Sequence, residues 1–245
     1  INRLETLLDG VAMLQEITPK TTDKVSSFGE ILSAKIIEAI FLENKLDTRL
    51  LDGHDLIQTA QQNGRLIINW EKTKENVARL YNSSSAKITL VPGFVARNEK
   101  GENTTLGRGG SDFTASILAN ILNASSIEIW TDVSGMYSAH PKIVAQAKPI
   151  ERLSYLEAME LSHFGAKVIY PPTLQPLVEK NIPTWIKNTF AKEDKGTLIT
   201  SGSEAPSSEV VKGMSHIDNV SLVTLEGSGM VGIPGFSKRL FEVLS

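Results

Sequence analysis

Apolar residues recur every three or four positions at the start of the chain. Further on, short β-branched runs alternate with segments that have this same helical spacing. Such spacing gathers apolar side chains on one face of a helix, so residues 1 to 16 are predicted to be helical. The pair Thr18-Pro19 ends this pattern. The positions that carry the helical pattern are Leu4, Leu7, Leu8, Val11 and Leu14.

The next segment predicts a strand that leads into a long amphipathic helix. Residues 23 to 28 (DKVSSF) have the character of a short strand, and residues 29 to 45 (GEILSAKIIEAIFLENK) have helical spacing. Glu30 would then lie at the junction of strand and helix. On the residues alone, the simplest interpretation of Glu30 is a carboxylate that interacts with the positive end of the helix dipole.

Strands and helices continue to alternate along the chain. This order predicts an α/β fold, an αβα sandwich with a mainly parallel sheet, in which ligands bind beyond the carboxyl ends of the strands. The further predicted strands span residues 46 to 51, 66 to 69, 87 to 92, 127 to 130 and 184 to 187. The further predicted helices span residues 71 to 81, 111 to 122, 154 to 162 and 173 to 180.

A long polar loop from Gly93 to Asp112 is the candidate site, because it ends in a glycine-rich run between a predicted strand and a predicted helix. Backbone N–H groups and the positive end of the helix dipole would face into the loop, which favours an anion such as phosphate or carboxylate. Arg108 adds a forked cation, and Ser111 or Asp112 can cap the helix or contact a phosphate-bound metal. A glycine-rich turn with an N-cap explains the same residues equally well.

Composition excludes several classes of protein. The net charge is −3, with 25 basic and 28 acidic residues that are well mixed, so a nucleic-acid partner is not expected. The chain has no cysteine, which excludes disulfides and thiolate metal sites and is compatible with a cytoplasmic location. No apolar run approaches membrane-spanning length and no export leader opens the chain, so no membrane partner is expected. The opening lacks methionine and has the pattern of a helix interior, which predicts a piece of a longer protein.

The end of the chain predicts a second, smaller unit. Residues 201 to 209 (SGSEAPSSE) have linker composition and mark a domain boundary. Strands are predicted at 210 to 215 and 220 to 226, and a helix at 236 to 244. Residues 227 to 232 form a G-x-G-x-x-G sequence, but a dinucleotide site also needs a complete βαβ unit and an acidic residue about 20 positions on. NAD binding is therefore not expected.

Several separated motifs resemble those of one known family. In their order along the chain, they closely resemble motifs of the aspartokinases of the amino-acid-kinase family, nearest to the kinase part of bifunctional aspartokinase/homoserine dehydrogenases. Neither a P-loop nor a protein-kinase catalytic-loop motif occurs. The matching motifs are SSFGE (26 to 30), RNEKGE (97 to 102), LGRGGSD (106 to 112), IWTDVSGMY (129 to 137), FGAKV (164 to 168) and IKNT (186 to 189).

The resemblance implies an ATP-dependent kinase that phosphorylates the side-chain carboxylate of L-aspartate to 4-phospho-L-aspartate, the first step of lysine, threonine and methionine synthesis. ATP would carry Mg²⁺ mainly on its own phosphates, and no metal site made by protein side chains is expected. An amino-acid effector, lysine or threonine, and a homo-oligomer are also implied. The alternative is a non-catalytic amino-acid-sensing or assembly module.

The resemblance also assigns roles to single residues. Glu30 would hold the amino group of aspartate and Arg108 its carboxylate. Asp112 would orient the cationic groups or magnesium, and Lys167 would stabilise the migrating phosphoryl group. The full set expected to bind aspartate is Glu30, Gly93, Phe94, Arg108 and Ser111.

The expected ATP-binding residues follow the strand at 127 to 130. Thr131 and Asp132 follow that strand directly, and on the residues alone a simple Asx turn is the favoured interpretation. The chain departs from the family at His140-Pro141-Lys142, where Asp-Pro-Arg is usual, and at Tyr170, where His is common. Lys142 keeps a positive charge but loses the guanidinium fork. The residues that the resemblance places at ATP are Thr131, Asp132, Tyr137, Lys142 and Lys167.

The domain assignment follows from these motifs. Residues 1 to 200 are predicted to be an aspartokinase catalytic domain, 201 to 209 a linker, and 210 to 245 the beginning of an ACT-like regulatory domain. The family's N-terminal KFGGTS strand and loop, with a second catalytic lysine and phosphate-binding glycines, is absent from this sequence. The 245-residue chain is therefore expected to have little kinase activity by itself.

Overall fold

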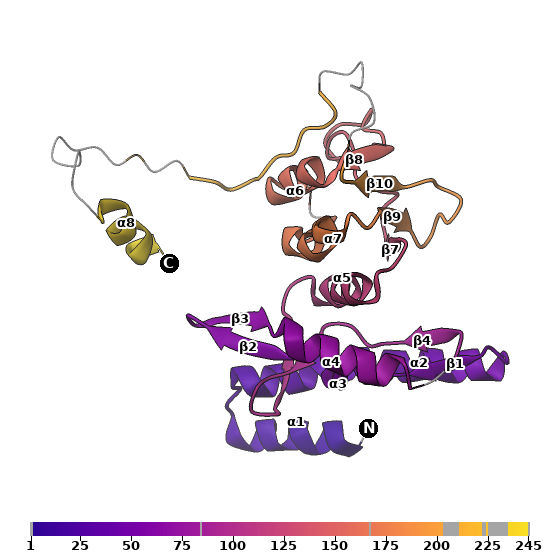
Figure 1. Ribbon diagram of the computed structural model, residues 1–245. Coiled ribbons are helices and arrows are strands. Elements are labelled where there is room, and N and C mark those ends of the chain that lie inside the picture. The colour runs from indigo at the N-terminus through magenta and orange to yellow at the C-terminus, as the bar shows by residue number, and fades with distance from the viewer. Residues whose placement is uncertain are drawn as a thin grey trace.

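The chain passes from an N-terminal group of helices and short strands to a second group built around a sheet, with helix α5 between them (Figure 1). The computed structural model describes residues 2–83, 85–166, 168–202, 211–221, 224 and 235–244. The first group contains α1 (Asn2–Leu14), α2 (Pro19–Glu43), β1 (Thr48–Leu50), α3 (Gly53–Leu56), β2 (Thr59–Gln62), β3 (Arg65–Ile68), α4 (Trp70–Tyr81), β4 (Ile88–Leu90), β5 (Val95–Arg97) and β6 (Asn103–Thr105).

Helix α2 is continuous, so the strand predicted at residues 23 to 28 is wrong, and Glu30 lies within the helix instead of at a strand-to-helix junction. The helix begins at Pro19, and the side chain of Thr18 accepts a hydrogen bond from the Thr21 N–H at 3.2 Å. Thr18-Pro19 thus starts a helix as well as ending the previous one, because serine-like N-caps and proline at the first position favour a helix start. Local β-character in residues 23 to 28 is overridden by this cap and by packing of the helix.

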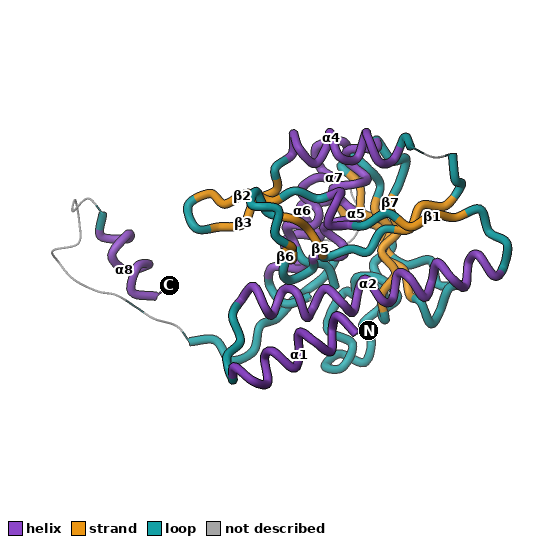
Figure 2. The backbone as a smooth tube through the Cα atoms, turned by 90° about the horizontal axis from the view of Figure 1, so that it is seen from below, coloured by secondary structure: helices purple, strands orange, loops and turns teal. Residues whose placement is uncertain are grey.

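The polar loop before α5 contains a hairpin that the sequence did not predict. Strands β5 and β6 pair antiparallel, and the turn between them is closed by the Asn98 N–H, which donates to the Glu102 carbonyl oxygen at 2.9 Å. Figure 2 shows these strands beside the first half of α2, while α1 runs along the same helix. Three-residue strands are too short to show a period-2 pattern among polar residues. The hairpin brings the glycine-rich run close to α2.

The second group is an α/β unit whose core pairing is mostly parallel, which confirms the predicted fold class. Its sheet has the order β7-β9-β10-β8, with β7·β9 and β10·β8 parallel and β9·β10 antiparallel, and β1 pairs parallel with β4 in the first group. The elements are α5 (Gly110–Leu122), β7 (Ile127–Thr131), β8 (Arg152–Ser154), α6 (Tyr155–His163), η1 (Pro171–Leu174), α7 (Gln175–Lys180), β9 (Thr184–Asn188) and β10 (Thr197–Thr200).

Helix α5 contributes to two hydrophobic cores at once. Ile117 is fully buried in the core of the first group, where it joins Leu56 and Ile57. Ala119 belongs to the core of the second group, which includes Ile186. Burial of apolar area on both sides fixes the helix axis, and therefore fixes the position of its N-terminus at the junction of the two groups.

The last described segments differ from their prediction in part. Helix α8 (Phe236–Leu244) is present as predicted, whereas residues 211 to 215 form no strand. Of the predicted linker at 201 to 209, residues 203 to 209 lie outside the described residues, as do the glycine run at 227 to 232 and residues 222, 223, 225 and 226 of the strand predicted at 220 to 226. Among the helices that the structure describes, none is both long and apolar enough to cross a membrane.

Candidate active site

The glycine-rich run turns the chain sharply into α5. Gly109 has φ 67° and ψ 18°, a left-handed conformation that favours glycine, and a Cβ there would lie 2.6 Å from the Cβ of Tyr170. The Gly110 N–H donates to the Gly107 carbonyl oxygen at 3.0 Å. Among the described residues, no side chain forms a capping hydrogen bond at this helix start. The first turn of α5 therefore offers N–H groups and a positive dipole end to an anion.

The strand that leads into the loop approaches α5 closely. A Cβ on Gly93 would lie 2.7 Å from the Cα of Ser111, so only glycine fits there. Phe94 has φ 69°, which is unusual for a bulky residue and costs on the order of 1–3 kcal/mol. Its backbone is held on both sides, because its N–H donates to Thr114 Oγ1 at 3.0 Å and its carbonyl oxygen accepts from the Leu106 N–H at 2.7 Å. Such strain concentrates at binding sites.

Glu30 reaches this loop from α2. The Ser111 hydroxyl donates to Glu30 Oε1 at 3.3 Å, although the two residues are 81 positions apart. A small cavity of about 310 Å³ lies between them, and it combines a carboxylate with an uncapped helix N-terminus. This pairing suits a ligand that carries an ammonium and a carboxylate group together. The cavity is lined by Glu30, Phe94, Gly107, Gly109, Gly110, Ser111 and Asp112.

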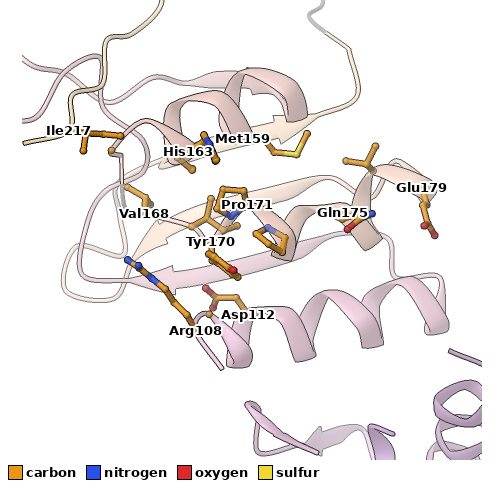
Figure 3. A pocket seen from close by; sticks show the side chains of 16 residues that line it. Arg108, Asp112, Met159, His163, Val168, Tyr170, Pro171, Gln175, Glu179 and Ile217 are labelled. Carbon is orange, nitrogen blue, oxygen red and sulfur yellow. The ribbon is translucent and has the colours of Figure 1, made fainter. Parts of the chain in front are cut away.

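Asp112 links the small cavity to a larger one of about 990 Å³. Its carboxylate accepts no hydrogen bond from any residue that the structure describes, and partial burial raises the pKa of Asp112 above its usual range. Arg108 lines the larger cavity but not the one beside Glu30, and its exposed guanidinium makes no ion pair within the described part of the chain. Figure 3 shows the Asp112 carboxylate just below Tyr170, while the Arg108 side chain extends to the left, away from Asp112 and Pro171. Arg108 therefore lines the same cavity as Asp112 and does not lie directly beside Glu30.

Four of the five residues predicted for ATP lie together in a third cavity of about 620 Å³. Thr131 and Asp132 follow β7, and the Thr131 hydroxyl donates to Asp132 Oδ1 at 3.1 Å. Tyr137 and Lys142 line the same cavity. Four residues that lie up to 11 positions apart in the sequence are thus close together at the carboxyl end of a parallel strand.

The three cavities follow one another along the molecule. Asp112 lines the first and second, and Gly165, Val168 and Ile217 line the second and third. Lys167, the predicted phosphate-binding lysine, lies between described neighbours in sequence but outside the described residues itself. A substrate in the small cavity and a nucleotide in the third would face each other across the middle one.

Residues 214 to 219 form a wall of the third cavity that the sequence analysis missed, and residues 211 to 213 lead into it. Lys212 pairs with Glu157 at 2.7 Å, and the Met214 N–H donates to the Ser138 carbonyl oxygen at 2.8 Å. The rings of His216 and His140 meet edge to face with centroids 5.5 Å apart. No composition or spacing signal marks this segment as part of a site, because the contacts that hold it there, to Glu157, Ser138 and His140, are distant in sequence.

Gly165 in the FGAKV motif is required by this wall. Its φ is 124°, and an added Cβ would clash with the carbonyl oxygen of His216. We therefore expect Gly165→Ala to lower the free energy of unfolding by about 1–3 kcal/mol. The matched control is Gly29→Ala, since Gly29 lies within α2 with no atom near its added Cβ, and alanine there should stabilise the helix by about 0.5–1 kcal/mol. Thermal unfolding checks both, and equal midpoints would contradict this account of Gly165.

Metal binding by protein side chains alone finds no support in the described ranges, where no group of three or more His, Asp or Glu side chains is placed to hold an ion. The unpartnered carboxylate of Asp112 fits a different arrangement. Mg²⁺ is commonly held by one or two carboxylates together with substrate phosphates. Asp112 has the oxygen ligands and the position for such a shared site.

Comparison with known proteins gives a consistent result. The amino acid kinase family matches residues 4–188. The chain is 36% identical over 245 residues to the bifunctional aspartokinase/homoserine dehydrogenase of Haemophilus influenzae, covering 99% of this chain and 30% of that protein. It is 33% identical over 248 residues to the lysine-sensitive aspartokinase 3 of Escherichia coli, covering 99% of this chain and 55% of that protein.

A solved structure agrees with these relatives. The crystal structure of E. coli aspartokinase III in complex with aspartate and ADP superimposes with a TM-score of 0.74 and 34% sequence identity, covering 84% of this chain and 47% of that one. The chain therefore spans between about a third and about half the length of the proteins it matches.

Proposed function

This chain belongs to the amino acid kinase family, and from that premise we propose that it is part of an aspartokinase that phosphorylates the side-chain carboxylate of L-aspartate with ATP. The observation that carries the proposal is the small cavity in which Glu30 faces the uncapped start of α5. Glu30 suits the ammonium group of an amino acid, and the α5 N–H groups suit a carboxylate. Aspartate offers both groups and a second carboxylate as phosphoryl acceptor.

The reaction asks for positioning and positive charge more than for acid–base chemistry. An oxygen of the aspartate side chain attacks the γ-phosphorus of ATP, the bond from that phosphorus to the β–γ bridging oxygen breaks, and ADP leaves with the electron pair. No general base is needed, because the attacking carboxylate is already ionised at neutral pH. Arg108 lines the middle cavity, where negative charge spreads over the transferring oxygens, and Lys167 is proposed to act there by resemblance.

The nucleotide is proposed to bind in the third cavity. Thr131, Asp132, Tyr137 and Lys142 line it, and the ribose and base edges offer hydrogen-bonding partners to such side chains. Mg²⁺ on the ATP phosphates would neutralise charge in the transition state when bound. Asp112 would hold that ion or orient nearby cations from the middle cavity.

A second proposal concerns regulation by an amino-acid effector. We infer that residues 210 to 245 open an ACT-like domain that binds an amino-acid effector in a homo-oligomer. Support comes from the similarity to an enzyme that is described as lysine-sensitive, and from residues 211 to 219, which extend from that region onto the nucleotide cavity. The glycine run at 227 to 232 is proposed to contribute to effector binding and not to an NAD site.

Aspartate-dependent release of ADP tests the proposed function. The full-length protein is assayed with ATP, Mg²⁺ and either L-aspartate or L-glutamate, and ADP is followed by a coupled enzyme assay. We expect aspartate to support turnover at least about a hundredfold faster than glutamate, because the extra methylene displaces the acceptor carboxylate from in-line attack. ADP release that aspartate does not increase would refute the proposal.

A further inference from the structure

A single carboxylate ties α2 to strand β6. Asp23 accepts a hydrogen bond from Thr104 Oγ1 at 3.0 Å on Oδ2 and another from Thr105 Oγ1 at 2.8 Å on Oδ1. The described residues give Asp23 these two neutral hydroxyls and no ion-pair partner. Because each carboxylate oxygen has its own donor, the pair fixes both the position and the rotation of the helix against the strand.

Asp23 and Glu30 lie on the same face of α2. They are seven residues apart, which is two helical turns and about 10 Å along the axis. Ser27 lies between them on this face and Ala34 lies one turn beyond, with only 3% and 7% of their surface exposed, so this face packs closely against its neighbours. Any slide or rotation of the helix at Asp23 therefore moves the carboxylate of Glu30.

The strand that Asp23 holds leads directly into the candidate site. Thr105 ends β6, and two residues later Gly107 lines the small cavity together with Glu30. At the other end of this connection, Ser111 contacts Glu30 through a longer, exposed hydrogen bond of 3.3 Å. The Asp23 bonds are shorter and less exposed. They therefore hold the helix to the loop more firmly than the contact between Ser111 and Glu30 does.

We propose that Asp23 is a positioning residue for substrate binding, which holds Glu30 at the separation from the start of α5 that an α-amino acid requires. Joining a helix to a strand through a partly buried carboxylate and neutral hydroxyls costs more desolvation free energy than apolar contact would. It does, however, define orientation, and a misplacement of about 1 Å at a binding group can cost up to about a hundredfold in rate. This inference rests on the proposed function, since it concerns the same site.

The test compares Asp23→Ala, Asp23→Asn and Thr104→Val/Thr105→Val in the full-length protein. We expect Asp23→Ala to raise the KM for L-aspartate about tenfold while the KM for ATP stays within about twofold. Asparagine keeps one acceptor and should give a smaller rise of about threefold. The double threonine variant should reproduce Asp23→Ala, and combining all three changes should add nothing further, because the groups act as one unit.

The matched control removes another contact between α2 and the β5–β6 hairpin. Lys20 pairs with Glu102 between α2 and the hairpin, but this pair is exposed and lies farther from Glu30. Lys20→Ala should leave both KM values within about twofold, because exposed ion pairs contribute little. Equal effects of Lys20→Ala and Asp23→Ala, or a parallel rise of both KM values, would overturn the inference while the proposed function stands. Absence of aspartate-dependent turnover in the unchanged protein would instead refute the proposed function.

Discussion

Replacing Glu30 with glutamine is expected to raise the KM for L-aspartate about a hundredfold and to change the KM for ATP by less than about threefold. Glutamine keeps the shape of Glu30, which lines the small cavity, but removes the charge that is proposed to bind the substrate ammonium group. A hydrogen bond to a charged group contributes about 1.5–3 kcal/mol, and the upper end of that range corresponds to about a hundredfold. The effect should be confined to aspartate, because the cavity proposed for the nucleotide is lined by other residues.

Steady-state kinetics of the full-length protein measures this effect. Glu43→Gln is the matched control, since Glu43 is an exposed carboxylate at the end of the same helix. It should leave both KM values unchanged. A Glu30→Gln variant whose aspartate KM stays within threefold of the unchanged protein would show that another group binds the substrate amine.

Changing Asp112 to asparagine is expected to lower kcat by about a thousandfold with smaller changes in both KM values. Asp112 lines the small and the middle cavity, so its charge lies where the acceptor carboxylate and the phosphates would meet. Loss of one preorganised electrostatic group at such a position costs about 10²–10³ in kcat. Steady-state kinetics with both substrates checks this, and a kcat within tenfold of the unchanged protein would exclude a catalytic role.

The same substitution should not destabilise the protein at neutral pH. Burial raises the pKa of Asp112 in the folded state above its unfolded value, because burial costs the ionised carboxylate more free energy than the protonated one. The resulting stability is fully present below the unfolded pKa and is lost as the pH rises through the raised folded pKa. At neutral pH the ionised carboxylate is therefore a net cost that asparagine removes.

Thermal unfolding at pH 7 should accordingly show an equal or higher midpoint for Asp112→Asn. The kcat of the unchanged protein should also begin to fall on the acid side at a pH above the usual aspartate range, because the ionised form is the active one. A lower midpoint for Asp112→Asn at pH 7 would contradict the assigned effect of burial. Asp9→Asn, at an exposed position in α1, is the control and should change neither property.

Much of the fold could be predicted where apolar spacing extends over several helical turns or through a buried strand. The apolar spacing in residues 111 to 122 and 127 to 130 predicted helix α5 and strand β7. The glycine run predicted a tight turn before α5, and the structure has a left-handed residue there at Gly109. Strands β2, β5, β6, β8 and β10 were not predicted. Each has only three or four residues, which is too short for a strand pattern to be recognised in the sequence.

The site itself could be predicted only in part. Thr131, Asp132 and Tyr137 share a motif, so a local resemblance is enough to group them. The contact between Glu30 and Ser111 depends on how α2 packs on the hairpin, which no local pattern encodes. The same holds for His216, whose place in the third cavity depends on packing against His140, 76 positions earlier in the chain.

The central claim is that the acceptor of the phosphoryl group is a carboxylate, and trapping the product tests it most directly. An acyl phosphate reacts with hydroxylamine to give a hydroxamate, whereas a phosphate ester or free phosphate does not. The full-length protein is incubated with ATP, Mg²⁺, L-aspartate and hydroxylamine, and the hydroxamate is measured as its coloured iron complex. We predict one aspartyl hydroxamate for each ADP released and none without aspartate. ADP release without hydroxamate would contradict the account.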